Sequence, residues 1–294
     1  MTPTHRGAEM PGTGLEQYVR DWRSGPVHTT DVMSPQRADE LAATLDLEFS
    51  AHPGDPLPPL WHWVYFGDWP PTADLGADGH PRNGHFLPPI PHRRRMFAGG
   101  RLRVAEPLLL GEPATRRAAL VSTAVKHGKT GELLFVTVRY EFSQDGQLRI
   151  TEEQDLVYRS DAGSGMSFGR VTEAPAVPSA PWVAEPVTHP ALLFRFSALT
   201  SNAHRIHYDQ PYATGVEGFP GLVVHGPLLA IYMAELARVN SDRRLSEFHF
   251  RLQRPVFVGD PIRVQGRIDD DDTAVLTVSS GAGTVHASAT AGFA

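Results

Sequence analysis

The sequence contains no cysteine among its 294 residues. Disulfide bonds, thiolate nucleophiles and zinc sites built on cysteine are therefore excluded. No window approaches the roughly 18 consecutive apolar residues of a transmembrane helix, so we expect no membrane span. The first fourteen residues are polar and lack the apolar segment of a signal peptide, which leads us to expect a cytoplasmic protein.

Basic residues are also fewer than acidic ones. The chain has 27 Lys and Arg and 33 Asp and Glu, which gives a net charge of −6. A nucleic-acid-binding surface favours the opposite sign, so no nucleic-acid partner is expected. The chain lacks a P-loop, a Rossmann glycine motif in a strand–helix context, and the HExxH and HxxEH motifs. His62, His80, His85 and His92 show no convincing metal-ligand spacing, and we predict a protein without a metal.

The N-terminal half begins with a helix signal and continues into strands. Residues 34–49 open with Ser-Pro and repeat apolar residues every four positions, which predicts an amphipathic helix. The segment LWHWVYF, residues 60–66, has strand propensity within a proline-rich region. Residues 72–100 are rich in Gly, Pro and His and indicate a long functional loop. Strand-like runs with turn signals between them then fill residues 99–159.

The same order repeats after a segment of small residues and proline. LLFRFSAL, residues 192–199, indicates a short strand, residues 226–240 indicate a helix, and residues 246–293 indicate strands. Each half thus has a helix followed by antiparallel strands, which predicts an α+β fold built twice. We place the N-terminal half at 1–160, a linker at 161–181 and the C-terminal half at 182–294.

The residues best suited to chemistry lie in the second half. Asn202, His204, His207, Tyr208 and Asp209 fall within eight positions, and a glycine-containing segment that leads into an apolar helix follows. A polar cluster supplies a proton-transfer group, and the start of a helix supplies backbone N–H donors beside it. This combination predicts a site that acts on an acyl group.

The run SNAHRIHYD, residues 201–209, resembles the signature of the MaoC-like hot-dog family, which includes R-specific enoyl-CoA hydratases. Residues 219–226, which end in His225-Gly226, are similar to the family segment that opens the central helix. RRRMFAGGRLRV, residues 93–104, is similar to the front half of double hot-dog enzymes. These include hydratases of mesaconyl-CoA or itaconyl-CoA and mitochondrial-type 3-hydroxyacyl-thioester dehydratases.

This resemblance implies a tandem double hot-dog fold, in which each half is a long helix wrapped by a curved antiparallel sheet. It implies reversible hydration of a 2-enoyl-CoA, or dehydration of a 3-hydroxyacyl-CoA, with the acyl-CoA as substrate and no cofactor. The favoured substrate is a short branched dicarboxylic acyl-CoA such as mesaconyl-CoA or itaconyl-CoA. We expect one active site per chain, between the halves, and a homodimer or a monomer.

The resemblance also assigns roles to residues. His207 would transfer protons, Asn202 would hold water, and the N–H of Gly226 would donate to the thioester oxygen. The expected substrate contacts are Tyr208, His204, His225, Arg94 and Arg95.

Three of these residues could have a purely structural role instead. Asn202 could simply close an Asx turn, His225 could be a structural hydrogen-bonding residue, and Gly226 could relieve a steric clash. The wider family has Asp where this chain has Asn202, and Asn cannot accept a proton.

Other functions fit the same motif. One alternative is a dehydratase of longer acyl chains, or of acyl groups on an acyl-carrier protein. Another is a non-catalytic pseudo-enzyme that binds acyl thioesters. This alternative is favoured by Asn202, which stands where the wider family has Asp. A hot-dog thioesterase is a third, although it calls for a carboxylate that activates water at the carbonyl.

Overall fold

The computed structural model describes residues 14–128, 131–160, 168–175, 177, 180–269 and 272–294. The expected linker lies partly outside these residues, and the polar N-terminal segment lies almost entirely outside them. The elements of the N-terminal half are α1 (Glu16–Val19), β1 (Val27–Val32), α2 (Pro35–Thr44), the 3-10 helices η1 (Trp61–Val64) and η2 (Thr72–Asp74), β2 (Arg93–Val104), β3 (Pro113–Gly128), β4 (Gly131–Gln144) and β5 (Gln147–Ser160). Those of the C-terminal half are β6 (Trp182–Ala184), α3 (Pro190–Leu199), the 3-10 helix η3 (Arg205–His207), α4 (Gln210–Gly215), α5 (Gly226–Val239), β7 (Leu245–Leu252), β8 (Arg263–Ile268), β9 (Ala274–Ser280) and β10 (Thr284–Phe293).

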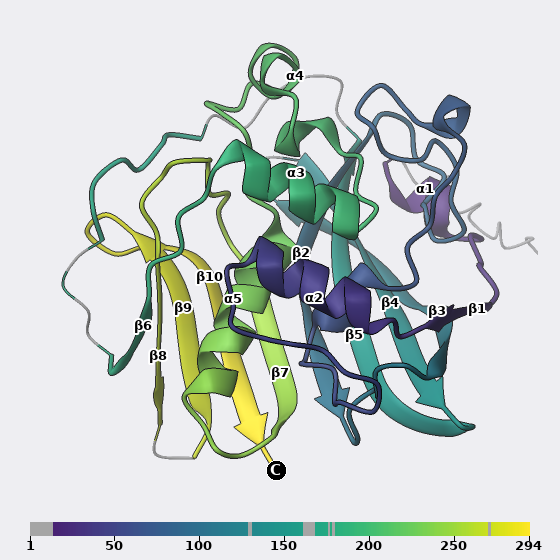
Figure 1. Ribbon diagram of the computed structural model, residues 1–294. Coiled ribbons are helices and arrows are strands. Elements are labelled where there is room, and N and C mark those ends of the chain that lie inside the picture. The colour runs from purple at the N-terminus through teal and green to yellow at the C-terminus, as the bar shows by residue number, and fades with distance from the viewer. Residues whose placement is uncertain (1–13, 129–130, 161–167, 176, 178–179, 270–271) are drawn as a thin grey trace, which may run out of the picture.

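The described strands form one antiparallel sheet in the order β1-β3-β4-β5-β2-β7-β10-β9-β8-β6 (Figure 1). The two halves join where β2 pairs with β7, with Leu102 opposite Phe248. The backbones approach closely at this junction, because a Cβ atom on Gly99 would lie 2.3 Å from the carbonyl oxygen of Phe250. Glycine at this position therefore allows the sheet to pass from one half to the other.

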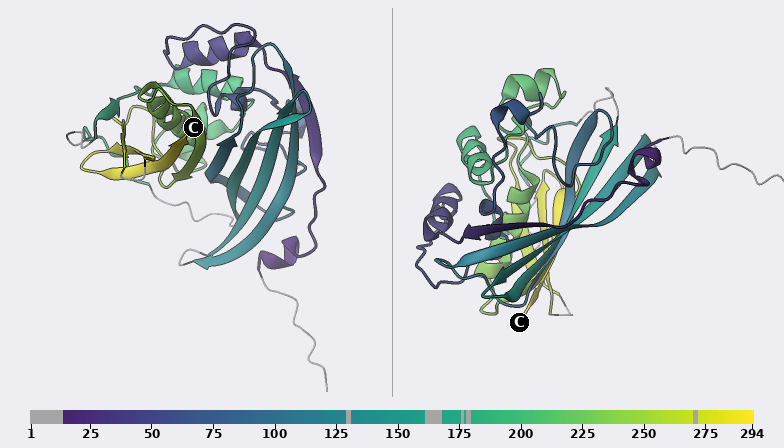
Figure 2. Two further views of the ribbon diagram at one scale, coloured as in Figure 1. Left: turned by 90° about the horizontal axis from the view of Figure 1, so that it is seen from below. Right: turned by 90° about the vertical axis from the view of Figure 1, so that its right-hand side faces the viewer.

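The C-terminal half wraps its strands around α5. This helix contacts β7, β8, β9 and β10, and it is buried from Leu228 to Leu236 apart from Tyr232. A helix that is apolar on nearly all sides belongs in the interior and not at a surface. The views in Figure 2 show α2, α3 and α5 gathered on one side of the sheet. The expected long helix wrapped by an antiparallel sheet is confirmed in this half.

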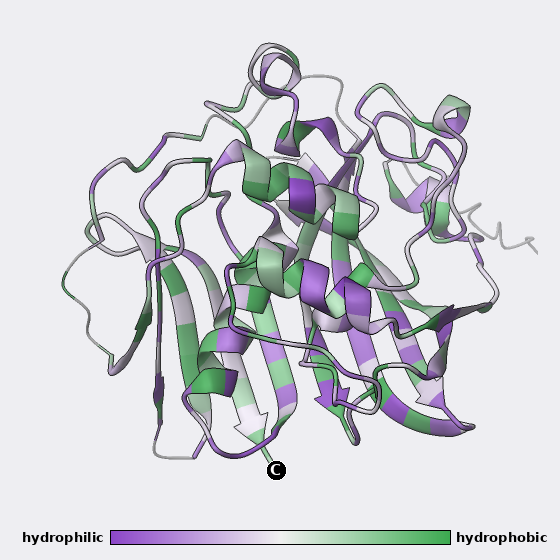
Figure 3. Cartoon of the chain, in the orientation of Figure 1, coloured by the Kyte–Doolittle hydropathy of each residue, from purple (hydrophilic) through white to green (hydrophobic). Residues whose placement is uncertain are grey.

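The N-terminal half has the longer strands and the shorter helix. Strands β3 to β5 form within the region where the sequence predicts strands, whereas β2 begins at Arg93, inside the segment 72–100 that was expected to be a loop. Hydrophobic and hydrophilic bands alternate along these strands (Figure 3). The amphipathic helix is confirmed as α2, although it ends at Thr44 and not near residue 49. It packs against α3 and η1. Within the described residues, no helix is both long and apolar enough to cross a membrane.

The strand expected at residues 60–66 is wrong. Its centre forms η1, and Leu60 before it has a left-handed backbone with φ of 69°. The indole N–H of Trp61 donates to Glu235 Oε1 at 2.9 Å, and that of Trp63 donates to Glu152 Oε1 at 2.8 Å. These hydrogen bonds to distant partners outweigh the local preference for extended backbone.

The short strand expected at residues 192–199 is also wrong, because the segment lies in α3. Pro190 occupies the first turn, and the Nδ1 atom of His189 accepts a hydrogen bond from the Leu192 N–H at 3.2 Å. Both are helix-start signals. The buried Leu192, Leu193 and Phe196 recur at the helical spacing.

Candidate active site

A cavity of about 1320 Å³ lies between the two halves of the chain. Strands β2, β4 and β5 and the loop before β2 form one wall, and the segment after α3, the start of α5 and residues 252–256 form the other. Six of the eight expected site residues line it: Asn202, His204, His207, Gly226, Arg94 and Arg95. Tyr208 and His225 do not.

His207 is the last residue of η3 and is buried, with 8% of its surface exposed. Its Nδ1 atom lies 2.7 Å from the carbonyl oxygen of Val223. A carbonyl can only accept, so Nδ1 carries the proton and Nε2 carries the lone pair. Burial lowers the pKa of His207 to about 4. The ring is therefore neutral near pH 7, and its Nε2 can accept a proton.

His225 lies behind His207 and not in the cavity. The two rings stack with centroids 3.7 Å apart and an angle of 16° between their planes. The Nε2 atom of His225 is 2.8 Å from the Ser197 hydroxyl, and burial lowers its pKa well below the usual value. Its role as a substrate contact is thus not supported. The position instead fits the structural alternative, in which His225 backs the His207 ring.

Asn202 follows α3 and lines the cavity. Its Oδ1 atom accepts the backbone N–H of His204 at 3.1 Å, which closes an Asx turn. Its own N–H donates to the Ser197 carbonyl at 2.8 Å. The turn therefore uses the oxygen of the side-chain amide, while the NH₂ group retains two donors that could hold water or a substrate oxygen.

Gly226 is the first residue of α5, as expected. A Cβ atom at this position would lie 2.3 Å from Leu252 Cδ1. The space beside the glycine is thus filled by Leu252, which fits the alternative in which the glycine relieves a steric clash. The N–H groups of the first helical turn have no partner within the helix, so that of Gly226 can still donate to an oxyanion.

Tyr208 and Asp209 do not line the cavity. Tyr208 is 43% exposed, and its hydroxyl donates to the Ala203 carbonyl at 2.9 Å. Asp209 accepts the N–H of Tyr212 at 3.1 Å, where it caps α4, and forms an ion pair with Arg205 at 2.7 Å. The carboxylate next in sequence to His207 is therefore already engaged in holding the loop.

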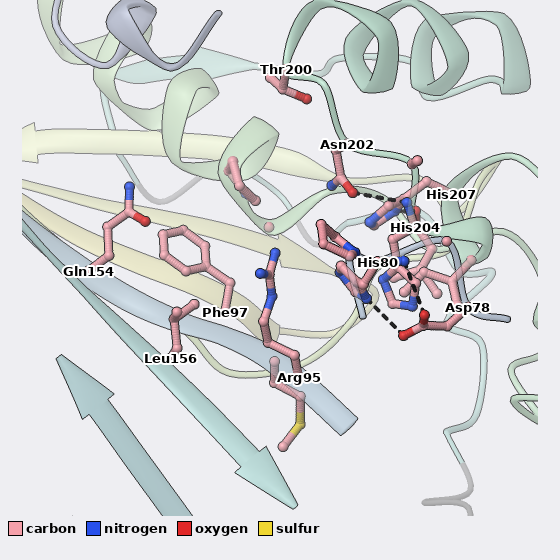
Figure 4. Close-up of a pocket in the computed structure, with 18 of the residues that line it drawn as sticks. Asp78, His80, Arg95, Phe97, Gln154, Leu156, Thr200, Asn202, His204 and His207 are labelled. Carbon is pink, nitrogen blue, oxygen red and sulfur yellow. Dashed lines mark hydrogen bonds and ion pairs between the residues drawn. The ribbon is translucent and has the colours of Figure 1, made fainter. Parts of the chain in front are cut away.

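Sequence reasoning missed two residues of the site, Asp78 and His80. The Nδ1 atom of His80 lies 2.9 Å from Asp78 Oδ2, and the backbone N–H of His80 donates to Asp78 Oδ1 at 3.0 Å. The His80 ring packs on His204, with centroids 4.0 Å apart (Figure 4). The only sequence signal is an Asp-Gly-His turn in the loop expected to be functional.

That loop is brought to the C-terminal half by backbone contacts. Gly79 has φ of 89°, and a Cβ atom on it would lie 1.8 Å from the carbonyl oxygen of Ala203. The N–H of Arg205 donates to the Asp78 carbonyl at 2.9 Å. These contacts join segments more than a hundred residues apart, and no local pattern predicts them.

Arg95 supplies a positive charge whose side-chain partner is the Tyr158 hydroxyl and not a carboxylate. It forms no ion pair among the described residues, whereas neighbouring Arg94 lies 3.6 Å from Glu217. Burial is the first cause of the lowered pKa values of His80, His204 and His207, and the charge of Arg95 lowers all three further. Figure 4 shows Arg95 in the cavity with the histidines. The site thus combines neutral imidazoles with a cation that an anionic substrate group could approach.

Asp78, His80 and His204 are also where a metal ion would find ligands. One ligand atom from each lies within 4.8 Å of the others. The hydrogen bond between Asp78 and His80 accounts for their proximity without an ion. Absence of a metal from the reaction stays a prediction.

Comparison with known proteins identifies the family. Residues 60–258 match the family described as hydroxyacyl-thioester dehydratase type 2. The chain belongs to this family. The expectation of a hydro-lyase that acts as a hydratase or dehydratase is thereby confirmed.

Two relatives agree with this assignment, and one solved structure agrees with the fold. The chain is 47% identical over 251 residues to mesaconyl-C(4)-CoA hydratase of Chloroflexus aurantiacus, covering 85% of this chain and 89% of that protein. It is 29% identical over 273 residues to the mitochondrial hydroxyacyl-thioester dehydratase type 2 of Schizosaccharomyces pombe, covering 82% and 90%. A double hot-dog protein from Mycobacterium tuberculosis superimposes with a TM-score of 0.55 at 14% identity, covering 93% and 97%. The double hot-dog fold is confirmed.

Proposed function

We propose that this protein hydrates a 2-enoyl-CoA whose acyl group is short, branched and dicarboxylic, the class that includes mesaconyl-CoA and itaconyl-CoA. The observation that carries the proposal is the guanidinium of Arg95, which lines the cavity and forms no ion pair among the described residues. Arginine binds carboxylates in a bidentate manner, and the free carboxylate of such a substrate would complete the pair. The 47% identity to a mesaconyl-C(4)-CoA hydratase supports the same class.

The proposed reaction uses three groups of the chain. Nε2 of His207 takes a proton from water while the water oxygen bonds to C3, and the NH₂ group of Asn202 holds that water. The backbone N–H of Gly226 donates to the thioester oxygen as it gains negative charge. The N–H bond at Nε2 of His207 then breaks as the new C2–H bond forms, which returns the imidazole to its neutral form. All atoms of the water molecule are retained in the 3-hydroxyacyl product. The scheme requires no cofactor beyond the acyl-CoA substrate.

The test is a substrate comparison with matched arginine variants. Purified protein is incubated with mesaconyl-, itaconyl- and crotonyl-CoA, and loss of enoyl absorbance is followed beside release of free CoA. Arg95→Gln should lower kcat/KM for the dicarboxylic substrates by more than about tenfold and change that for crotonyl-CoA little, because only the former lose a charged partner. Arg103→Gln is the control, since Arg103 lies on the same strand, pairs with Glu247 and does not line the cavity.

Other results would contradict the proposal. An equal loss with all substrates in Arg95→Gln would mean that Arg95 binds the CoA portion or supports the fold. Release of CoA without loss of the enoyl group would indicate a thioesterase. Tight binding without turnover would indicate a pseudo-enzyme that only binds acyl thioesters.

A second candidate is a dehydratase of longer acyl chains, carried by CoA or an acyl-carrier protein. The cavity exceeds the roughly 300–1000 Å³ of common ligand pockets, and Trp63, Phe97 and Leu156 give its N-terminal wall an apolar part. A series of enoyl-CoA substrates from four to twelve carbons tests it. Rates that rise with chain length would favour this candidate.

We place the activity in the cytoplasm, where acyl-CoA substrates would be available. The absence of cysteine, and hence of disulfide bonds, fits this reducing compartment. The sequence leaves a homodimer and a monomer open, because two hot-dog halves already pair within one chain. Analytical ultracentrifugation of the purified protein distinguishes the two.

A further inference from the structure

The proposed reaction gives no role to the polar groups in the N-terminal part of the cavity. Glu152 and Gln154 of β5 line the cavity there. We propose that Gln154, held in place by Glu152, selects against acyl groups with long apolar tails and thereby favours short ones. This inference rests on the proposed function, because it concerns the acyl group of the same substrate. It adds a specificity-determining residue and a positioning residue to the site.

Glu152 is a buried carboxylate held by three donors. Nε2 of His62 lies 2.7 Å from its Oε2, and the Trp63 indole N–H and the Gln154 amide N–H both donate to its Oε1 at 2.8 Å. Glu152 is only 1% exposed. Burial of a carboxylate is costly unless hydrogen bonds of this kind compensate for the lost water. Because His62 and Trp63 belong to η1, the three bonds fix Glu152 between η1 and its own strand.

The hydrogen bond to Glu152 orients the side-chain amide of Gln154 and uses only part of it. A carboxylate can only accept, so the NH₂ group of Gln154 must be the end that faces Glu152. The second N–H of that group and the carbonyl Oε1 have no partner among the described residues. Since Gln154 lines the cavity and is only partly buried, both groups are available to water in this part of it.

The strand register places Gln154 farther from the histidines than Arg95. Across β2 and β5, Arg95 pairs with Tyr158 and Phe97 pairs with Leu156. Side chains alternate along a strand, so Gln154 is the next residue of β5 on the face of Leu156 and Tyr158. It precedes Tyr158 by four residues, which corresponds to about 13 Å along the strand. In Figure 4, Arg95 and Phe97 lie between the histidines and Gln154.

This placement makes Gln154 sensitive to the length of the acyl group. A short acyl group whose carboxylate pairs with Arg95 would end before Gln154, whereas the tail of a long one would displace the water beside it. Methylene groups cannot replace the lost hydrogen bonds, so the free N–H and Oε1 would be buried without partners. A site built to form hydrogen bonds discriminates strongly against a group that cannot form them.

The neighbouring side chains show why the amide matters. Trp63 and Phe97 contact each other edge to face, with ring centroids 6.2 Å apart, and Leu156 lies opposite Phe97. These apolar groups alone would favour an apolar tail. Gln154 and Glu152 place polar groups in the same wall of the cavity and thus oppose that preference.

The principal competing account is that Glu152 and Gln154 only support the fold. The hydrogen bonds from His62 and Trp63 join η1 to β5 without any contribution from Gln154. Replacement of Gln154 therefore tests the specificity role apart from this joint. Gln154→Met keeps the length of the side chain and removes its amide, so that an apolar surface takes the place of the polar groups.

The experiment measures kcat/KM for crotonyl-CoA, octenoyl-CoA and dodecenoyl-CoA. We expect the wild type to prefer crotonyl-CoA. Gln154→Met should raise the ratio of kcat/KM for dodecenoyl-CoA to that for crotonyl-CoA by about tenfold or more, because the tail no longer removes water from an amide. The value for crotonyl-CoA itself should stay within about threefold of the wild type.

Gln147→Met is the matched control. Gln147 is exposed on the same strand and does not line the cavity, so its replacement should leave the ratio unchanged. If Gln154→Met does not fold, Gln154→Ala takes its place, because it removes the same amide without filling the space. Variants are compared only when their melting temperatures are close to that of the wild type.

A double-mutant comparison tests Glu152 as the positioning residue. Glu152→Gln keeps the shape of the side chain but replaces one acceptor oxygen by a donor, which weakens its hold on Gln154. It should raise the same ratio by less than Gln154→Met does, and it should add no further increase in the Gln154→Met background. A purely structural contribution would instead lower kcat/KM for all substrates by the same factor in both backgrounds.

The possible failures are distinguishable. An unchanged ratio in the Gln154 variants, or an equal loss with every substrate, would overturn the inference, and so would a wild type that prefers dodecenoyl-CoA to crotonyl-CoA. The proposed function is tested separately, by Arg95→Gln with mesaconyl-CoA and crotonyl-CoA. Failure of that test beside an increased ratio in Gln154→Met would overturn the dicarboxylic substrate alone.

Discussion

The rings of His207 and His225 lie face to face, 3.7 Å apart, at the junction between η3 and the start of α5. One ring lines the cavity and the other is fully buried behind it. His225 is fixed in turn by Ser197 of α3. The orientation of the proposed base therefore depends on three separate elements that pack together, and several measurements can test this arrangement.

Replacement of His207 by Ala should lower kcat for hydration by about 100- to 10,000-fold, the usual contribution of a general base. His249→Ala is a suitable control, because His249 is exposed on β7 and does not line the cavity. The measurement is the steady-state rate with mesaconyl-CoA on folded protein. Near-wild-type rates in the His207 variant would remove it from the mechanism.

Acid should destabilise the protein through His207. Its pKa is about 4 in the folded state and about 6.5 in the unfolded chain, so the unfolded chain binds more protons between these values. The contribution of His207 to the free energy of unfolding is therefore fully present above pH 6.5. It is lost as the pH falls toward 4, and the loss from this residue alone is about 3 kcal/mol.

Urea unfolding at pH 7 and pH 5 measures this loss, and His207→Asn should show less of it. His52→Asn should behave like the wild type, since that side chain is 71% exposed. An equal acid sensitivity in wild type and His207→Asn would contradict the assignment.

The amide of Gly226 can be tested with two substitutions of similar shape. Both Gly226→Ala and Gly226→Pro introduce a Cβ atom against Leu252, but only proline removes the N–H. Proline is tolerated in the first turn of a helix. We expect Gly226→Pro to be about 100- to 1000-fold slower than Gly226→Ala if the N–H stabilises the oxyanion.

A reference variant controls for the steric part of this change. Gly226→Ala combined with Leu252→Ala relieves the contact and should recover the stability that Gly226→Ala loses, about 1–3 kcal/mol. If the alanine and proline variants have the same kcat, the N–H does not act in the reaction.

The contact between Trp61 and Glu235 should contribute to the stability of the joined halves. Trp61 lies in the N-terminal half and is fully buried, and its indole N–H donates to Glu235 of α5. Trp61→Phe leaves this acceptor without its indole donor and opens space, which should cost about 2–4 kcal/mol. Thermal and urea unfolding measure the change. Trp69→Phe should be nearly neutral, because Trp69 is 73% exposed.

Much of the candidate site follows from contiguous sequence. The cluster from Asn202 to His207 and the helix start at Gly226 lie close together along the chain, so their types and spacing indicate acyl chemistry before any fold is known. Both groups line the cavity. The antiparallel strands were also predictable, because alternation of apolar and polar residues is a local property.

Local pattern failed where distant contacts decide the backbone. Residues 60–66 have strand propensity but form η1, because Trp61 and Trp63 reach acceptors in other parts of the chain. The short apolar run in α3 could not be told from a strand by periodicity alone, although Pro190 was an available signal.

Local patterns of the sequence determined that a helix and antiparallel strands occur twice and that an imidazole and a glycine belong to the site, because each depends on residues near one another along the chain. The double hot-dog fold and the family followed from the resemblance of residues 201–209 and 219–226. Only the tertiary structure decided that Asp78 and His80 lie beside His204, that His225 stands behind His207, and that Arg95 lines the cavity without an ion pair among the described residues. These relationships join residues from both halves, and they arise from the pairing of β2 with β7 and from loop contacts that no single segment encodes.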